Sequence, residues 1–103
     1  MHKYEILYIL DSKLDDAKKD KEIEKFSSII EKQGGKVESV VKTAPWGLKK
    51  FAYPIDYKKD GFYVLKTFIA KPTTIAELEH RMKLADSVMR FKTAIVLKNY
   101  NLD

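Results

Sequence analysis

The stretch YEILYIL, residues 4–10, is apolar at almost every position and rich in residues that favour strands. Such a run is typical of a strand in the middle of a sheet. The spacing then changes, because Ile23, Phe26 and Ile30 recur three and four residues apart, which predicts the apolar stripe of a helix. The first third of the chain therefore predicts a central strand followed by a helix.

The remainder of the chain alternates in the same way. Gly34 and Gly35 supply a residue that can adopt the left-handed conformation and end the helix. Thr74 and Glu77 have the spacing of a capping box, which predicts the start of a second helix there. The other β-prone runs predict three more strands, at residues 36–43, 62–70 and 89–97. The first of them is interrupted at residues 44–47 and continues as extended chain over residues 48–55. A turn is predicted at residues 58–61, before the next strand.

The predicted elements follow one another in the order β-α-β-β-α-β. Right-handed crossovers in the two strand–helix–strand units give an α+β fold of the ferredoxin-like, split β-α-β type. Its four-stranded antiparallel sheet has the order 4-1-3-2, with both helices on one face. A chain of 103 residues fits one such domain, which we place at residues 1–98, with a short C-terminal tail at 99–103.

Composition narrows the class of protein. Hydrophobic residues make up 45% of the chain and charged residues 34%, which is too apolar for a disordered chain and too polar for a membrane protein. There is no cysteine, which excludes disulfides and thiolate chemistry and fits a cytoplasmic location. The net charge of +5 is uneven: residues 1–34 carry 7 basic and 8 acidic groups, whereas residues 35–70 carry 7 and 3. This positive field is typical of a protein that contacts phosphates.

Catalytic and metal-binding patterns are missing from the sequence. His2 and His80 are far apart, and there is no Gly-rich phosphate loop, nucleophile elbow or H-E-x-x-H pair. Asp15 and Asp16 lie where a helix begins, so their carboxylates complement the helix dipole. We therefore expect no enzymatic activity, no metal and no cofactor.

A binding module for single-stranded RNA is one alternative. The RNA-recognition-motif fold has the same topology and stacks bases on aromatic side chains of its two central strands. The segments at residues 7–9 and 61–64 place Tyr8 and Tyr63 on those strands. Asp60 before the glycine departs from the basic residue of that motif, so the match is partial.

The alternation of side chains along the strands favours a protein-binding face instead. Glu5 shares its face of the first strand with Leu7 and Ile9, so Tyr8 should point toward the helices. The third strand then turns Val64 and Phe68 inward, together with an unexpected Lys66, and the fourth strand turns Phe91 and Ile95 inward. The predicted open face carries Leu7, Ile9, Tyr63 and Leu65, flanked by Arg90 and Lys92. An exposed apolar patch of this kind is typical of a protein interface.

The segment WGLKKFAYPI, residues 46–55, resembles the W-G-x-(R/K)-(R/K)-L-A-Y-P-I run of the family of bacterial small-ribosomal-subunit protein six. Similar runs occur at residues 4–6, 26–35, 61–65 and 86–90, so the resemblance extends over almost the whole chain. It implies the ferredoxin-like fold and a structural, non-enzymatic role in the ribosome. It further implies binding to the central domain of small-subunit rRNA as a heterodimer with small-subunit protein eighteen.

The resemblance and the charge pattern together give two sets of candidate residues. The RNA-binding set is basic: His2, Lys3, Lys49, Lys50, Lys83, Arg90 and Lys92. The protein-partner set is apolar or aromatic: Leu7, Ile9, Trp46, Tyr53, Tyr63 and Leu65. Pro45, Gly47 and Pro54 restrict the backbone around residues 46–55, which predicts a protruding hairpin arm or a sheet edge. A stand-alone RNA-binding protein and an interaction domain without RNA remain the alternatives.

Overall fold

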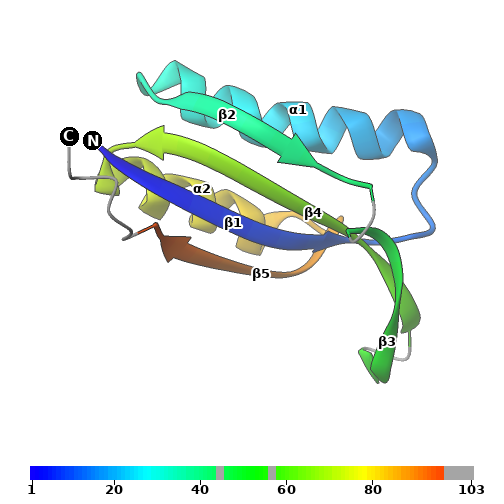
Figure 1. Cartoon of the computed structure of the whole chain (residues 1–103). Helices are drawn as coiled ribbons and strands as arrows, with labels where there is room; N and C mark the ends of the chain where they lie inside the picture. The colour runs from blue at the N-terminus through cyan, green and yellow to red at the C-terminus, as the bar shows by residue number, and fades with distance from the viewer. Residues whose placement is uncertain (44–45, 56–57, 97–103) are drawn as a thin grey trace.

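The computed structural model describes residues 1–43, 46–55 and 58–96. Five strands form one antiparallel sheet, and two helices pack on one of its faces (Figure 1). In chain order the elements are β1 (His2–Leu10), α1 (Asp16–Lys32), β2 (Lys36–Val41), β3 (Gly47–Ile55), β4 (Lys58–Ala70), α2 (Pro72–Leu84) and β5 (Val88–Ile95). This architecture confirms the predicted α+β, ferredoxin-like fold.

The strand order is β2-β4-β1-β5, and β3 pairs separately with β4. The four predicted strands therefore keep their predicted order, but the segment expected to continue the second strand is a fifth strand. The predicted turn at residues 58–61 is wrong, because β4 already begins at Lys58. Asp60 and Gly61, which are residue types common in turns, instead pair with β3. Lys49 lies opposite Gly61, and Lys50 lies opposite Asp60. The resulting β3–β4 hairpin bends away from the main sheet (Figure 1).

Helix α1 has the end signals that its sequence predicts. The Asp15 carboxylate accepts a hydrogen bond from the Lys18 amide at 2.8 Å, which caps the first turn. At the other end Gly34 has φ +86°, and the amide of Gly35 donates to the Ile30 carbonyl at 3.0 Å. This pattern is a Schellman motif, which turns the chain sharply from α1 into β2.

Helix α2 starts three residues earlier than predicted, because its N-cap is Lys71 rather than Thr74. Pro72 occupies its first turn, where a residue without an amide proton costs no hydrogen bond. Thr74 is consequently inside the helix and cannot cap it; its buried hydroxyl lies 3.2 Å from the Gln33 side-chain oxygen after α1. The predicted capping box is wrong, and the contact instead joins the two helices.

The core lies between the sheet and the helices, and its sheet side follows the predicted alternation. Tyr8, Val64 and Phe68 are fully buried on the helix side, as expected. Phe91 packs against the same cluster, but Ile95 is 42% exposed. The prediction for Ile95 is wrong because β5 is an edge strand with a neighbour on one side only, and Ile95 is its last residue.

Candidate functional site

The open face of the sheet carries the predicted apolar residues in two rows. In one row Leu7 of β1 lies between Leu65 of β4 and Lys92 of β5. In the next row Ile9 of β1 lies between Tyr63 of β4 and Arg90 of β5. The apolar side chains therefore occupy the two central strands, and the edge strand adds a basic border.

Trp46 folds back onto this face. Its ring stacks on the ring of Tyr63, with the centroids 6.2 Å apart and the planes 24° apart. The Lys49 ammonium lies 5.2 Å from each of the two ring centroids, which is within range of a cation–π interaction. Gly47 permits the fold-back, since its φ is +92° and a Cβ there would lie 2.6 Å from the Lys42 carbonyl oxygen.

Two shallow hollows flank the row of Leu7. One has a volume of about 250 Å³ and is lined by Glu5, Leu7, Trp46, Leu65, Lys92 and Ala94. The other has a volume of about 180 Å³ and is lined by Leu7, Ile9, Arg90, Phe91 and Lys92. Their walls are mostly apolar, and charged side chains stand at their borders. Such hollows can accept apolar side chains of a protein that lies across the sheet.

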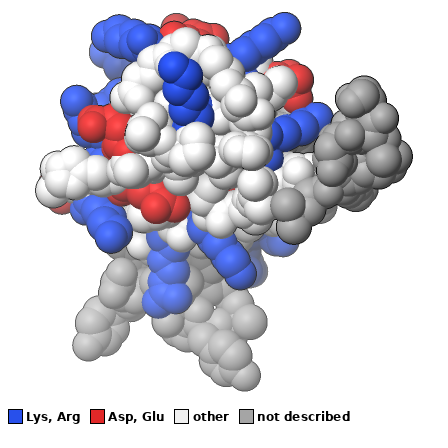
Figure 2. Space-filling model, turned by 90° about the vertical axis from the view of Figure 1, so that its left-hand side faces the viewer, with Lys and Arg blue, Asp and Glu red and all other residues white. Residues whose placement is uncertain are grey.

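The predicted basic residues do not gather in one patch. His2 and Lys3 begin β1, whereas Arg90 lies opposite Ile9 near the far end of that strand, about 24 Å away at 3.4 Å per residue. Lys83 of α2 and Arg90 line a separate hollow of about 390 Å³. At the end of the molecule where β1 begins, basic side chains are spread around the surface with acidic ones among them (Figure 2).

Lys49 and Lys50 are separated although they are adjacent in sequence. Consecutive side chains of a strand point to opposite faces, and the ammonium of Lys49 lies over the two open-face rings. Lys50 is exposed and lies opposite Asp60 in the β3–β4 ladder. The side chain of Tyr53, which we predicted near the partner, lies outside the described residues.

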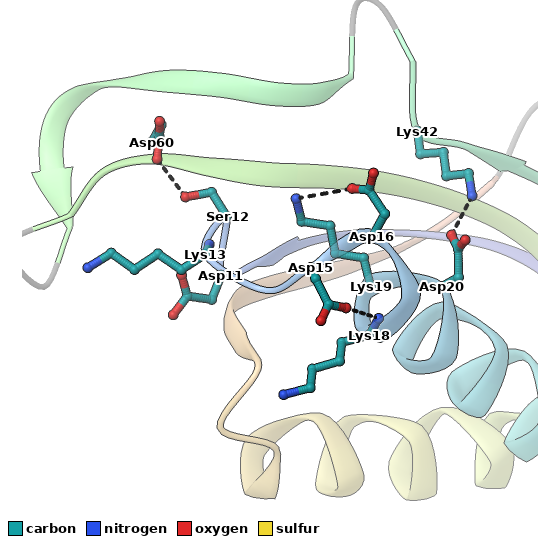
Figure 3. A network of polar contacts seen from close by, with 10 residues as sticks. All are labelled: Asp11, Ser12, Lys13, Asp15, Asp16, Lys18, Lys19, Asp20, Lys42 and Asp60. Carbon is teal, nitrogen blue, oxygen red and sulfur yellow. Dashed lines mark hydrogen bonds and ion pairs between the residues drawn. The ribbon is translucent and has the colours of Figure 1, made fainter.

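A polar network that the sequence did not reveal holds the base of the hairpin (Figure 3). The hydroxyl of Ser12, in the loop after β1, donates to the Asp60 carboxylate of β4 at 2.7 Å. Lys42, after β2, forms an ion pair with Asp20 of α1 at 2.8 Å. Ser12 and Asp60 are 48 positions apart in the sequence, and Lys42 and Asp20 are 22 positions apart. No local sequence pattern could therefore have indicated these contacts.

Comparison with known proteins identifies the family of this chain. The family model described as ribosomal protein S6 matches residues 3–94. The chain is 45% identical over 91 residues to the small ribosomal subunit protein bS6 of Clostridium novyi, covering 88% of this chain and 93% of that one. The chain belongs to the ribosomal protein S6 family.

A second relative supports this assignment, and a solved structure shows the same fold. The small ribosomal subunit protein bS6 of an Exiguobacterium species is 42% identical over 93 residues, covering 90% of this chain and 95% of that one. The crystal structure of the 30S ribosomal protein S6 from Thermotoga maritima superimposes with a TM-score of 0.88 at 24% identity, covering 98% of this chain and 92% of that one. That structural similarity concerns the fold.

Membership in the S6 family confirms the coarse functional predictions. The protein is a component of the small ribosomal subunit, in the cytoplasmic ribosome, and rRNA is its partner class. The family consists of structural ribosomal proteins, which confirms the predicted non-enzymatic role. Within the described part of the chain, no three His, Asp or Glu side chains are grouped so as to hold a metal ion. Neither described helix is long and apolar enough to cross a membrane.

Proposed function

We propose that this S6-family chain binds the central domain of small-subunit rRNA together with small-subunit ribosomal protein eighteen. The open sheet face receives the protein partner, and basic side chains outside the apolar rows contact RNA phosphates. The observation that carries the proposal is the stack of Trp46 on Tyr63 beside the apolar hollows at Leu7.

The geometry of the aromatic residues favours a protein partner over unpaired bases. A base-stacking sheet needs free aromatic faces on its central strands. Tyr8 is fully buried on the helix side, and the ring of Tyr63 is already stacked on Trp46. Phe62 has the Lys19 ammonium 4.7 Å from its ring centroid. The aromatic side chains that would form such a platform are therefore engaged within the protein.

The apolar rows have the composition expected of the centre of a protein interface. Leu7, Leu65 and Tyr63 are half-buried within the isolated chain, and a partner would complete their burial. Arg90 and Lys92 are exposed at the border, where charges affect orientation and association rate more than affinity. Arg90 also lines the hollow beside Lys83, so the basic border continues toward α2.

Tyr63→Ala tests the proposal, with Leu84→Ala as the matched control. Leu84 is 68% exposed at the end of α2, and it belongs to neither apolar row of the open face. We expect Tyr63→Ala to weaken the complex with protein eighteen about 10- to 100-fold, as the loss of an aromatic anchor does. Leu84→Ala should leave that affinity unchanged. The measurement is calorimetric titration with the purified partner.

Affinity for short single-stranded RNA is measured on the same variants. Under the proposal it stays low and does not respond to Tyr63→Ala. Tight binding of single strands without the partner, lost in Tyr63→Ala, would contradict the proposal and favour the RNA-recognition-motif alternative. Base stacking on one ring contributes about 1–3 kcal/mol, which this titration resolves easily.

A further inference from the structure

A lysine side chain is enclosed between the sheet and α1. Lys66 of β4 has no exposed surface, although it points to the same side as Val64 and Phe68 of the core. Its ammonium nitrogen donates a hydrogen bond of 2.9 Å to the carbonyl oxygen of Ile23 in the middle of α1. The same nitrogen lies 5.5 Å from the ring centroid of Tyr8.

The surroundings of Lys66 compensate its charge only in part. The acidic groups that act on this pocket come from α1: Glu31 favours the charged form of Lys66, and Glu22 acts on Tyr8. The ladder partners of Lys66 are Ile6 of β1 and Val40 of β2, and neither carries a charge. Burial outweighs the effect of Glu31 and lowers the pKa of Lys66 to about 7.

We propose that Lys66 is a proton-sensitive contact that makes the docking of α1 on the sheet weaker when its amine is charged and firmer when it is neutral. An amine can donate to the Ile23 carbonyl in either state, so the hydrogen bond is retained. What changes is the cost of holding a positive charge away from water, which only the charged form incurs. Opening of α1 removes that cost by hydrating the side chain.

The direction of the effect follows from the two protonation states. In the open or unfolded chain, Lys66 keeps the ordinary lysine pKa of 10.5, whereas in the docked state its pKa is about 7. The stabilising contribution is therefore fully present above 10.5 and is lost as the pH falls through 7. The steepest part of the change lies between these values, so it begins at neutral pH.

Amide hydrogen exchange of the full chain tests the proposal at pH 6.5 and 8.5, with protection factors corrected for intrinsic exchange rates. From the two pKa values, we expect protection of amides in α1 to rise about 20-fold over this interval. Amides in α2 should change less, because the hydrogen-bond acceptor of Lys66 and the acidic group that acts on it both belong to α1. Lys66→Met should abolish the rise in α1, while Lys36→Met, which removes an exposed lysine of β2, should preserve it.

The titration of Lys66 is also measured directly in the unaltered protein, so the test does not depend on a variant that folds. NMR of protein labelled at the lysine Cε carbons should show one lysine with a midpoint near neutral pH, and Lys66→Met should remove that signal. A midpoint above 9.5 for every lysine would overturn the proposal. An equal rise in protection for α1 and α2 would also overturn it, because proton release would then stabilise the whole molecule rather than the docking of α1.

Discussion

The two glycines between α1 and β2 should respond very differently to alanine. At Gly34 the backbone has φ +86°, but nothing lies within 4 Å of the position that a Cβ would occupy. Alanine there incurs the left-handed strain of about 1–2 kcal/mol. Alanine also reduces the conformational entropy of the unfolded chain, which stabilises the folded state by about 0.4–1 kcal/mol. The difference between these two effects is centred near 1 kcal/mol, so we expect Gly34→Ala to reduce the free energy of unfolding by about 1 kcal/mol.

At Gly35 the obstacle is steric. A Cβ would lie 2.7 Å from the Ile69 carbonyl oxygen, 3.0 Å from the Ile30 carbonyl oxygen and 2.8 Å from the Ile30 Cγ2. Two of these atoms belong to the backbone of β4 and α1 and cannot rotate away. Overpacking of this kind costs about 1–3 kcal/mol. In the alanine variant, a shift of residue 35 away from these atoms would also strain its Schellman hydrogen bond to the Ile30 carbonyl. We expect Gly35→Ala to cost about 2–3 kcal/mol.

Thermal unfolding followed by circular dichroism separates the two variants. A loss of 1 kcal/mol lowers the melting temperature of a domain of this size by about 4–8 °C. Gly35→Ala should therefore melt about 8–24 °C below the unaltered protein, and Gly34→Ala about 4–8 °C below it. Gly34→Asn serves as the control, since asparagine tolerates the left-handed region and should cost still less. A larger loss for Gly34→Ala than for Gly35→Ala would refute this account of the turn.

Three further perturbations address the RNA contacts, the hairpin base and the buried tyrosine. Lys50→Glu with Lys83→Glu should flatten the log–log salt dependence of rRNA binding, measured in the presence of the partner, by about 0.7–0.9 per lost phosphate contact. The same charge change at exposed positions of α1, Lys18→Glu with Lys21→Glu, should leave the slope unchanged. An unchanged slope for the first pair would remove it from the interface. Ser12→Ala should lower the free energy of unfolding by about 1–2 kcal/mol in chemical denaturation, because the Asp60 carboxylate loses the hydroxyl that donates to it at 2.7 Å. An unchanged free energy of unfolding would show that the base of the hairpin does not depend on this bond. Burial, reinforced by Glu22, raises the pKa of Tyr8 above its ordinary value of 10.0, so the free energy of unfolding should fall as the pH rises above 10. Tyr8→Phe should remove this part of the fall, which denaturation curves taken at pH 9 and pH 11 measure.

The parts of the fold that the sequence predicted are those with local causes. The start of α1 depends on a cap between Asp15 and Lys18, three residues apart, and its end depends on Gly34. These signals lie within one turn of the helix, so they can be recognised without knowing the fold. The prediction of a capping box at Thr74 was wrong although its signal is equally local, because the helix begins at Pro72 with Lys71 as its N-cap, three residues earlier.

The parts that escaped prediction depend on contacts between distant segments. Residues 58–61 have the composition of a turn, yet pairing with β3 keeps them extended. Lys66 stood out from the sequence as a charge on the inner face. The compensation for its burial is the Ile23 carbonyl, 43 positions away. Leu7, Tyr63 and Leu65 lie on the open face of the sheet, as the alternation of side chains predicted. Nothing local in the sequence indicated that Trp46 would stack on Tyr63.

The β3 strand connects the two proposed binding surfaces. The turn at Gly47 places Trp46 and Lys49 over the open face, where Lys49 interacts with both rings. Lys50, one residue further along, extends from the strand where it pairs with Asp60, whose carboxylate is fixed by Ser12. A partner that presses on Trp46 therefore acts on the strand that carries Lys50. The base of the hairpin is held by Ser12 and its start is folded onto Tyr63, so we infer that β3 would couple the proposed protein-binding surface to the proposed RNA-binding surface.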